Sequence, residues 1–154
     1  MTVSDEGATV ARLVTFLGIG KYDETTYRFV ERPPAQRTSY VCRALAETLQ
    51  PSDITVLATE EAEERHGSAL KEALRAGNCP APRFVRIAAG REPAELWQQF
   101  EVIKTELRGS AGPIMLDITH GFRSQPFFAA AVAAFVHAVD ESPPELRVCY
   151  AAYE

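Results

Sequence analysis

Two short apolar runs constrain the fold of this chain more than any other feature of its sequence. ARLVTFLG (11–18) ends at a glycine and has the length and flanks of a buried strand. PIMLDI (113–118) shows no alternation of apolar and polar residues, which is typical of a strand covered on both faces. Strands of this kind occur in parallel sheets that carry helices on both sides. We therefore expect a layered protein with a buried parallel sheet.

Strand-like and helix-like segments alternate along the rest of the chain. Further strands are predicted at 25–31, 53–59, 83–88 and 146–153. Helices are predicted at 36–49, 60–76, 96–107 and 125–139. Thr59 is the expected N-cap of the second helix, and Gly77 its expected end. Alternation with short connections predicts an α/β fold: a Rossmann-like three-layer sandwich, with a mainly parallel sheet flanked by helices.

Length and apolar patterning point to one domain outside the membrane. The 154 residues fit a single unit over 1–154, with a flexible N-terminus expected at 1–10. The longest apolar run, 127–139, is shorter than the roughly 20 residues that span a bilayer. No basic region leads into an apolar stretch near the N-terminus, so no signal peptide is visible. These features predict a cytoplasmic protein with no membrane partner.

Net charge and cysteine spacing narrow the range of ligands. The net charge of −5 argues against a general surface for duplex nucleic acid, which needs clustered cations, but it leaves room for a local basic pocket. Cys42, Cys79 and Cys149 lie far apart and form no C-x-x-C pair. Neither a zinc site nor a disulfide framework is indicated. We expect reduced thiols, no metal and no cofactor.

The first polar corner, GIGKYDETTY (18–27), follows the first predicted strand. It lacks the third glycine of a dinucleotide fingerprint, and its lysine is followed by Tyr22 where a P-loop has serine or threonine. A tight turn after a strand explains the pattern. The functional alternative is that Gly18 and Gly20 let the backbone approach a ligand while Lys21 binds an anion.

The second polar corner, DITHGFRS (117–124), lies between a predicted strand and a predicted helix. Free backbone N–H groups are expected here, and Gly121 permits close approach of an anion. Arg123 offers a planar fork to phosphate oxygens, and His120 can donate to phosphate or move a proton near neutral pH. Ser124 is a candidate N-cap. Since ligands bind at the carboxyl ends of parallel strands, we expect both corners at one edge of the sheet.

Other interpretations of the second corner, including a purely structural one, stay open. Asp117 and Thr119 can hydrogen-bond locally and shape the turn, which would make His120 incidental. Metal binding by Asp117 and His120 lacks further ligands at suitable spacing. His66 is placed on a charged helix face and His137 in an apolar helix, and both are interpreted as structural.

Together the two corners resemble a known family. DITHGFRS is similar to the D-x-T-H-G signature of the CRISPR-associated Rossmann fold (CARF) domain, in the branch named for that motif. The resemblance extends over about 11–154. It includes FLGIGKYDETTYRF (16–29), LATEEAEERHGSALKEAL (57–74), ELWQQFEVI (95–103) and YAAYE (150–154).

The resemblance implies a homodimeric sensor of cyclic oligoadenylates, the second messengers of type III CRISPR defence. The ring would lie across the two-fold axis, over the carboxyl ends of the strands. Ring size is left open, with tetra-adenylate as the first candidate. An effector domain, commonly a ribonuclease, usually follows the sensor in this family and would lie outside this chain.

The implied ligand-binding residues come from both corners, with Asp117 in a structural role. They are Gly18, Gly20, Lys21, Tyr22, Thr119, His120, Gly121, Phe122, Arg123 and Ser124. Three aromatic residues lie in or next to the two corners and could stack on bases: Tyr22, Tyr27 and Phe122.

Two other functions stay open. The first is a metal-independent ring nuclease, in which a 2′-hydroxyl attacks the neighbouring phosphate and leaves a 2′,3′-cyclic phosphate. His120, Lys21 and Arg123 would then be the catalytic residues. The second is an unrelated nucleotide-binding α/β protein that shares the corner by chance.

Overall fold

A computed structural model describes residues 10–29, 37–108, 110–122 and 124–152. Its described part contains a five-stranded sheet in the order β3-β2-β1-β4-β5, and all neighbouring strands are parallel. The strands are β1 (Arg12–Leu17), β2 (Asp53–Ala58), β3 (Pro82–Arg86), β4 (Ile114–Asp117) and β5 (Leu146–Cys149). The helices are α1 (Val41–Leu49), α2 (Glu60–Ala76), α3 (Pro93–Arg108) and α4 (Gln125–Val139). The predicted Rossmann-like α/β fold is confirmed.

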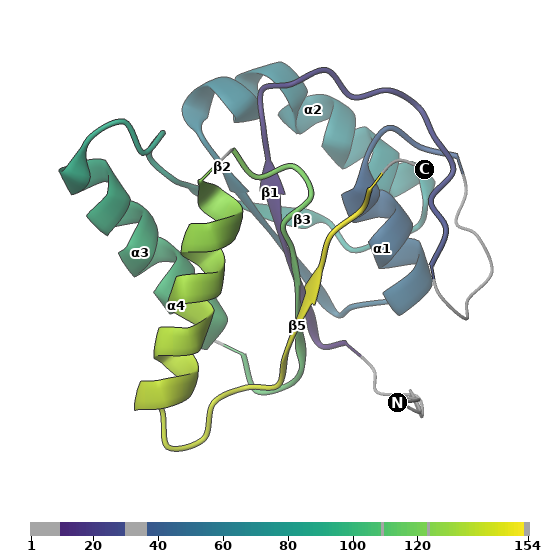
Figure 1. Ribbon diagram of the computed structural model, residues 1–154. Coiled ribbons are helices and arrows are strands. Elements are labelled where there is room, and N and C mark those ends of the chain that lie inside the picture. The colour runs from purple at the N-terminus through teal and green to yellow at the C-terminus, as the bar shows by residue number, and fades with distance from the viewer. Residues whose placement is uncertain (1–9, 30–36, 109, 123, 153–154) are drawn as a thin grey trace.

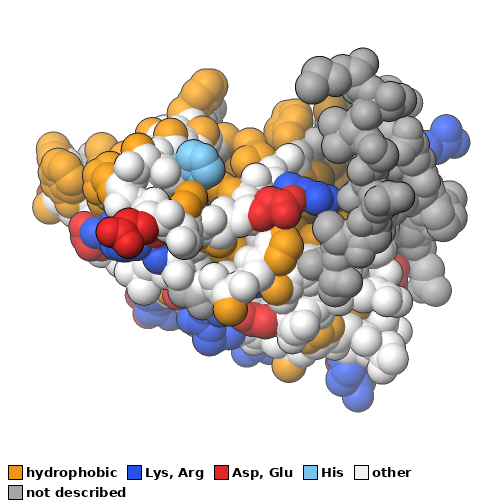
Figure 2. Space-filling view, turned by 90° about the horizontal axis from the view of Figure 1, so that it is seen from below, with side chains coloured by type: hydrophobic (Ala, Val, Ile, Leu, Met, Phe, Trp, Pro, Cys, Tyr) orange, Lys and Arg blue, Asp and Glu red, His pale blue; other side chains and the backbone are white. Residues whose placement is uncertain are grey.

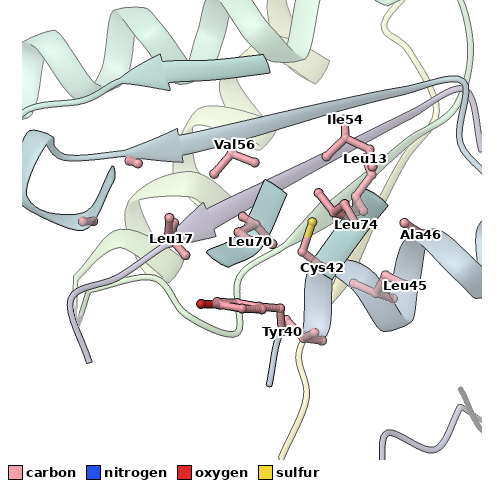
Figure 3. Packing of buried hydrophobic residues seen from close by; sticks show 13 residues of the cluster. Leu13, Leu17, Tyr40, Cys42, Leu45, Ala46, Ile54, Val56, Leu70 and Leu74 are labelled. Atoms are coloured by element: carbon pink, nitrogen blue, oxygen red, sulfur yellow. The ribbon is translucent and has the colours of Figure 1, made fainter. Parts of the chain in front are cut away.

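Helices cover both faces of the sheet, with α1 and α2 on one side and α3 and α4 on the other (Figure 1). Successive side chains of a strand point to opposite faces, so β1 supplies both halves of the core. Leu13 and Leu17 pack with α1 and α2, and Figure 3 shows this cluster. Val14 and Phe16 pack with α3 and α4. The absence of alternation in these strands is therefore explained by burial on both faces.

The ends of α2 agree with the sequence. Thr59 Oγ1 accepts a hydrogen bond from the Ala62 N–H at 3.2 Å, and the first turn carries Glu60 and Glu61. Acidic residues suit this end because the helix dipole is positive there. At the other end Gly77 is the C-cap, with its N–H bonded to the Ala73 carbonyl.

Two predicted elements differ from the structure. Residues 25–29 form no regular strand; Thr25 forms an isolated antiparallel bridge with Thr38, and Phe29 is a bridge residue as well. Their alternating pattern reflects packing of Tyr27 and Phe29 against the core beside α1, because ring burial does not require sheet pairing. The first helix begins at Val41, later than predicted.

Some predicted segments lie partly outside the described residues. Positions 30–36 are among them, as are 1–9 of the N-terminus that was expected to be flexible. Val10, the last residue of that expected segment, is described and buried.

The three cysteines are free. Burial raises the pKa of the Cys149 thiol to about 11 and also raises that of Cys42. Both thiols are therefore protonated and weakly nucleophilic near neutral pH. Within the described residues, no helix combines the length and apolar character needed to cross a bilayer.

The order of the strands reverses between β1 and β4. From β1 the chain moves outward through β2 and β3, then returns to place β4 on the other side of β1 and β5 beyond it (Figure 1). In open α/β sheets this reversal leaves a crevice at the carboxyl ends of the two central strands, and ligands bind there. The segments that follow Leu17 and Asp117 lie at this point.

Candidate functional site

The two polar corners meet at the reversal point, as the sequence predicted. Gly18 follows β1 directly, and a Cβ built on it would lie 2.8 Å from the His120 carbonyl oxygen, which belongs to the segment after β4. Contacts this short between a Cβ and a backbone oxygen do not occur in folded proteins, so the close approach depends on glycine. In contrast, a side chain at Gly20 would meet open space.

Asp117 is a fully buried carboxylate at the end of β4. The Thr15 hydroxyl, on the neighbouring position of β1, donates to its Oδ2 at 2.6 Å. The Thr119 N–H donates to Oδ1 at 3.0 Å. Burial raises the pKa of Asp117, while these two hydrogen bonds lower it. These contacts support the structural role expected of Asp117, because it links β1 to the turn that carries His120.

Thr119 connects this turn to the chain after β5. Its Oγ1 accepts a hydrogen bond from the Ala151 N–H at 2.9 Å. The turn is thus fixed at Asp117 on one side and at Ala151 on the other. His120 follows Thr119 directly, and on its other side the Gly121 N–H donates to the Ile118 carbonyl. Hydrogen bonds of both adjacent residues therefore fix the backbone around His120.

The Tyr22 side chain makes its contacts within the protein. Its hydroxyl accepts from the Gly18 N–H at 2.8 Å and donates to the Gly18 carbonyl at 3.1 Å. Its ring lies 4.5 Å from the His120 ring, 4.7 Å from the His66 ring and 5.1 Å from the Tyr40 ring, measured between centroids. Burial raises the pKa of the phenol, so it stays protonated. Tyr22 positions the loop after β1, and its ring would have to leave these neighbours to stack on a ligand.

His66 was missed as a residue of this site. It lies on α2 at four-residue spacing between Ala62 and Leu70, both of which are buried. That spacing places it on the inner face of the helix, and it was the available signal. The glutamates around it suggested a charged face instead. Arg65, its neighbour, donates to the Ile19 carbonyl at 2.9 Å, so α2 contacts the loop after β1 twice.

His120 is half-buried between Tyr22 and Asp117. Burial lowers the pKa of its imidazole, and the charge of Asp117 partly opposes that shift. Its Nε2 is buried and has no hydrogen-bond partner among the described residues, and the same holds for Nε2 of His66. Buried polar atoms normally have a partner, so each unpaired nitrogen has capacity to bind water or a ligand. A neutral imidazole in this position can accept or donate a proton.

The remaining predicted residues after β1 and β4 are placed as follows. The Lys21 side chain is 85% exposed and forms an ion pair with Asp23 at 2.6 Å. Phe122 is exposed beside the site. A Cβ built on Gly121 would lie 3.3 Å from Pro126 Cδ, so a side chain there would be crowded by the start of α4. Arg123 lies outside the described residues.

The start of α4 corrects two expectations. Ser124 occupies the N-cap position, but its side chain makes no capping hydrogen bond, because its backbone is helical rather than extended. The Gln125 side chain bonds back to the segment before the helix, since its Oε1 accepts from the Phe122 N–H at 2.7 Å. The Gly121 N–H points to the Ile118 carbonyl at 3.4 Å. The N–H groups of residues 121 and 122 are therefore engaged, although the sequence suggested that they were free for an anion.

A cavity of about 320 Å³ opens beside His120 at the same edge of the sheet. Its walls come from the loop after β1, the turn after β4 and the chain after β5. They are formed by Thr25, Thr26, Tyr27, Arg28, Thr119, His120, Tyr150, Ala151 and Ala152. Among the described residues of this lining none is acidic, and Arg28 is the one cation that is charged at all physiological pH values. Sequence reasoning did not single out Arg28 or Tyr150.

A larger hollow of about 600 Å³ lies over the ends of β2 and β3. Glu60, Glu61 and Glu64 line it together with Arg86 and Arg91, and Arg86 is paired with Glu60 at 2.6 Å. Three carboxylates disfavour a phosphate ligand, so the smaller cavity fits the predicted chemistry better. Across the described ranges, no three His, Cys, Asp or Glu side chains gather closely enough to hold a metal ion.

The environment of His120 predicts a dependence of stability on pH. Its pKa in the folded protein lies below the ordinary 6.5, so the unfolded chain binds a proton more readily and stability falls as pH drops below about 6.5. Asp117, whose folded pKa is raised, has the opposite effect at lower pH. Urea unfolding at about pH 7.5 and 6 should therefore show a loss of stability that is smaller in His120→Asn. Equal losses in both proteins would contradict this assignment.

No protein-family model matches the chain, and no curated protein matches it significantly.

Proposed function

We propose that the chain is a sensor domain that binds cyclic oligoadenylate as a homodimer. The observation that supports the proposal is the meeting of GIGKYDETTY and DITHGFRS at the reversal point of the sheet, beside a cavity whose described lining residues include no acidic one. These are the two segments that resemble the CARF motifs. In the fold they lie where α/β proteins bind nucleotides.

The local charge at this edge suits a cyclic phosphate ligand in spite of the acidic net charge. Lys21 and Arg28 follow β1 and are exposed, and Arg123 follows β4 in the sequence. An isologous dimer presents each of these cations twice. A ring of phosphates on the two-fold axis would then meet paired cations, and the attraction is confined to this edge.

The outer face of α4 supports self-association. Its exposed positions carry Phe127, Phe135 and Val139 with alanines between them, and Phe127 is 82% exposed. Figure 2 shows hydrophobic side chains gathered over the part of the molecule that α3 and α4 form. Contiguous apolar surface of this kind commonly marks an interface, since it gains stability when water is removed.

Binding and association can be tested together. Sedimentation velocity at micromolar concentration should show a dimer, and titration calorimetry should show binding of cyclic tetra-adenylate or cyclic hexa-adenylate to it. Linear tetra-adenylate is the matched control and should bind more weakly, because it lacks the symmetry of the site. A monomer both with and without the rings, together with no heat of binding, would overturn the proposal.

A ring nuclease is the second candidate, and the unpaired Nε2 of His120 favours it. In this reaction the 2′-oxygen of one adenylate bonds to the adjacent phosphorus while its proton passes to a base. The bond from phosphorus to the 5′-oxygen breaks, and that oxygen receives a proton. The products carry a 2′,3′-cyclic phosphate and a 5′-hydroxyl.

Turnover by this route should survive EDTA. His120→Ala should slow it by about 10²–10⁴-fold, the usual contribution of acid–base catalysis. Chromatography of the products over time would measure both effects. Full activity in His120→Ala, or loss of activity in EDTA, would exclude this mechanism. No turnover by the wild type would leave binding without cleavage.

A further inference from the structure

Tyr150 and Arg28 both line the cavity beside His120. Tyr150 directly follows β5 and is 67% exposed, although it is a large aromatic residue at a sheet end. Arg28 is exposed and forms no ion pair with any described residue. Both line the cavity of about 320 Å³. A flat ring and an uncompensated cation on one cavity are the groups that bind a base and its phosphate.

Backbone contacts hold both walls of this cavity in place. On the Tyr150 side, the Ala151 N–H donates to Thr119 Oγ1 at 2.9 Å. On the Arg28 side, Thr25 and Thr38 exchange two backbone hydrogen bonds at 2.9 and 3.0 Å. The cavity is therefore formed before a ligand arrives, which lowers the entropy cost of binding.

The size and lining of the cavity select the class of ligand. Small-molecule sites usually have about 300–1,000 Å³, so this one is suited to a single nucleotide unit rather than to a whole ring. Ala151 and Ala152 leave room next to Tyr150, and Thr25 and Thr26 supply hydroxyls. The described residues of the lining carry Arg28 and no carboxylate, which favours an anion.

We propose that this cavity binds one adenylate unit, with the base stacked on Tyr150 and the phosphate on Arg28. The proposal rests on the proposed function, since it assigns the base-binding part of the same ligand. His120 would then lie beside the bound adenylate unit. The rest of the cyclic oligoadenylate would extend from there toward the reversal point of the sheet. The sequence alone left the residues that contact the base unassigned.

The test compares four variants by titration with cyclic tetra-adenylate. Tyr150→Ala should weaken binding about 5- to 100-fold for each site, the range for loss of one base stack. Tyr150→Phe keeps the ring and should bind nearly as well as the wild type. Arg28→Ala should weaken binding about 10- to 100-fold for each site, as expected for a charged hydrogen bond. Arg75→Ala, an exposed arginine on α2, is the control and should have no effect.

A second titration separates this proposal from the proposed function. Adenosine monophosphate, added to millimolar concentration, should shift the NMR amide signals of Thr119, Ala151 and Ala152 in the wild type but not in Tyr150→Ala or Arg28→Ala. Inorganic phosphate alone should shift them less. If these shifts occur while no cyclic oligoadenylate binds, the cavity assignment stands and the sensor function fails. If cyclic tetra-adenylate binds equally to the wild type, Tyr150→Ala and Arg28→Ala, the sensor function stands and the cavity assignment is overturned.

Discussion

Asp117→Ala is expected to lower the free energy of unfolding by about 2–5 kcal/mol, since each buried donor left unpaired costs about 1–3 kcal/mol. The substitution removes the acceptor of both the Thr15 hydroxyl and the Thr119 N–H. Thr15 lies on the central strand β1 and is buried, so water does not replace its lost partner. Removing the buried carboxylate also removes its own desolvation cost, which keeps the loss below the sum of the two contacts. Urea unfolding followed by circular dichroism would measure it.

Two variants make the result specific to Asp117. Asp117→Asn keeps the shape and one acceptor, so it should lose less than half as much stability. Asp23→Ala removes an exposed carboxylate whose ion pair with Lys21 lies in solvent, and it should change stability by less than about 0.5 kcal/mol. A loss in Asp117→Ala no larger than that of Asp23→Ala would show that the carboxylate does not support the turn.

Arg123→Ala is expected to weaken the binding of cyclic tetra-adenylate by about 10²–10⁴-fold. A hydrogen bond to a charged group contributes about 1.5–3 kcal/mol, and a two-fold dimer loses two of them for each ring. At about 1.4 kcal/mol for each factor of ten, the loss reaches this range. The expectation rests on the sequence, which places Arg123 between Gly121 and the first turn of α4. Lys21→Ala should act in the same direction.

Salt dependence and a surface control complete this test. Calorimetry at two salt concentrations should show a smaller salt effect in Arg123→Ala than in the wild type, because one phosphate contact is missing from each subunit. Arg75→Ala again serves as the control, since that side chain is exposed and paired with Glu72. Wild-type affinity in both Arg123→Ala and Lys21→Ala would place the ring elsewhere on the protein.

Local sequence patterns were sufficient to predict most of the fold. The bounds of α2 and α4 follow from capping residues and apolar spacing, and the structure has both helices as predicted. Unalternating strands indicated the covered sheet. The common edge of the two corners followed from the rule for parallel strands. Each of these inferences depends on neighbours along the chain or on general topology.

The errors arose where contacts between distant segments decide the outcome. Residues 25–29 alternate like a strand, but Thr25 pairs with Thr38, and the segment does not join the five-stranded sheet of the described part. From the sequence, Tyr22 was expected to be available to a ligand. Its contacts with His66 and His120 link segments that are distant in the chain, so local sequence does not reveal them. Ser124 makes no capping hydrogen bond because its backbone is helical, and the Gln125 side chain bonds back to Phe122; sequence does not reveal this geometry.

The position of Tyr22 has a mechanical consequence. Its ring touches Tyr40 at the start of α1, His66 on α2 and His120 after β4, and its hydroxyl is bonded to Gly18. Close-packed interiors transmit displacement because they contain little free space. A displacement of His120 would therefore reach the ring of Tyr22 first, and through it Tyr40 before α1 and His66 on α2. The ring of Tyr22 thus connects the reversal point mechanically to both helices on that face of the sheet.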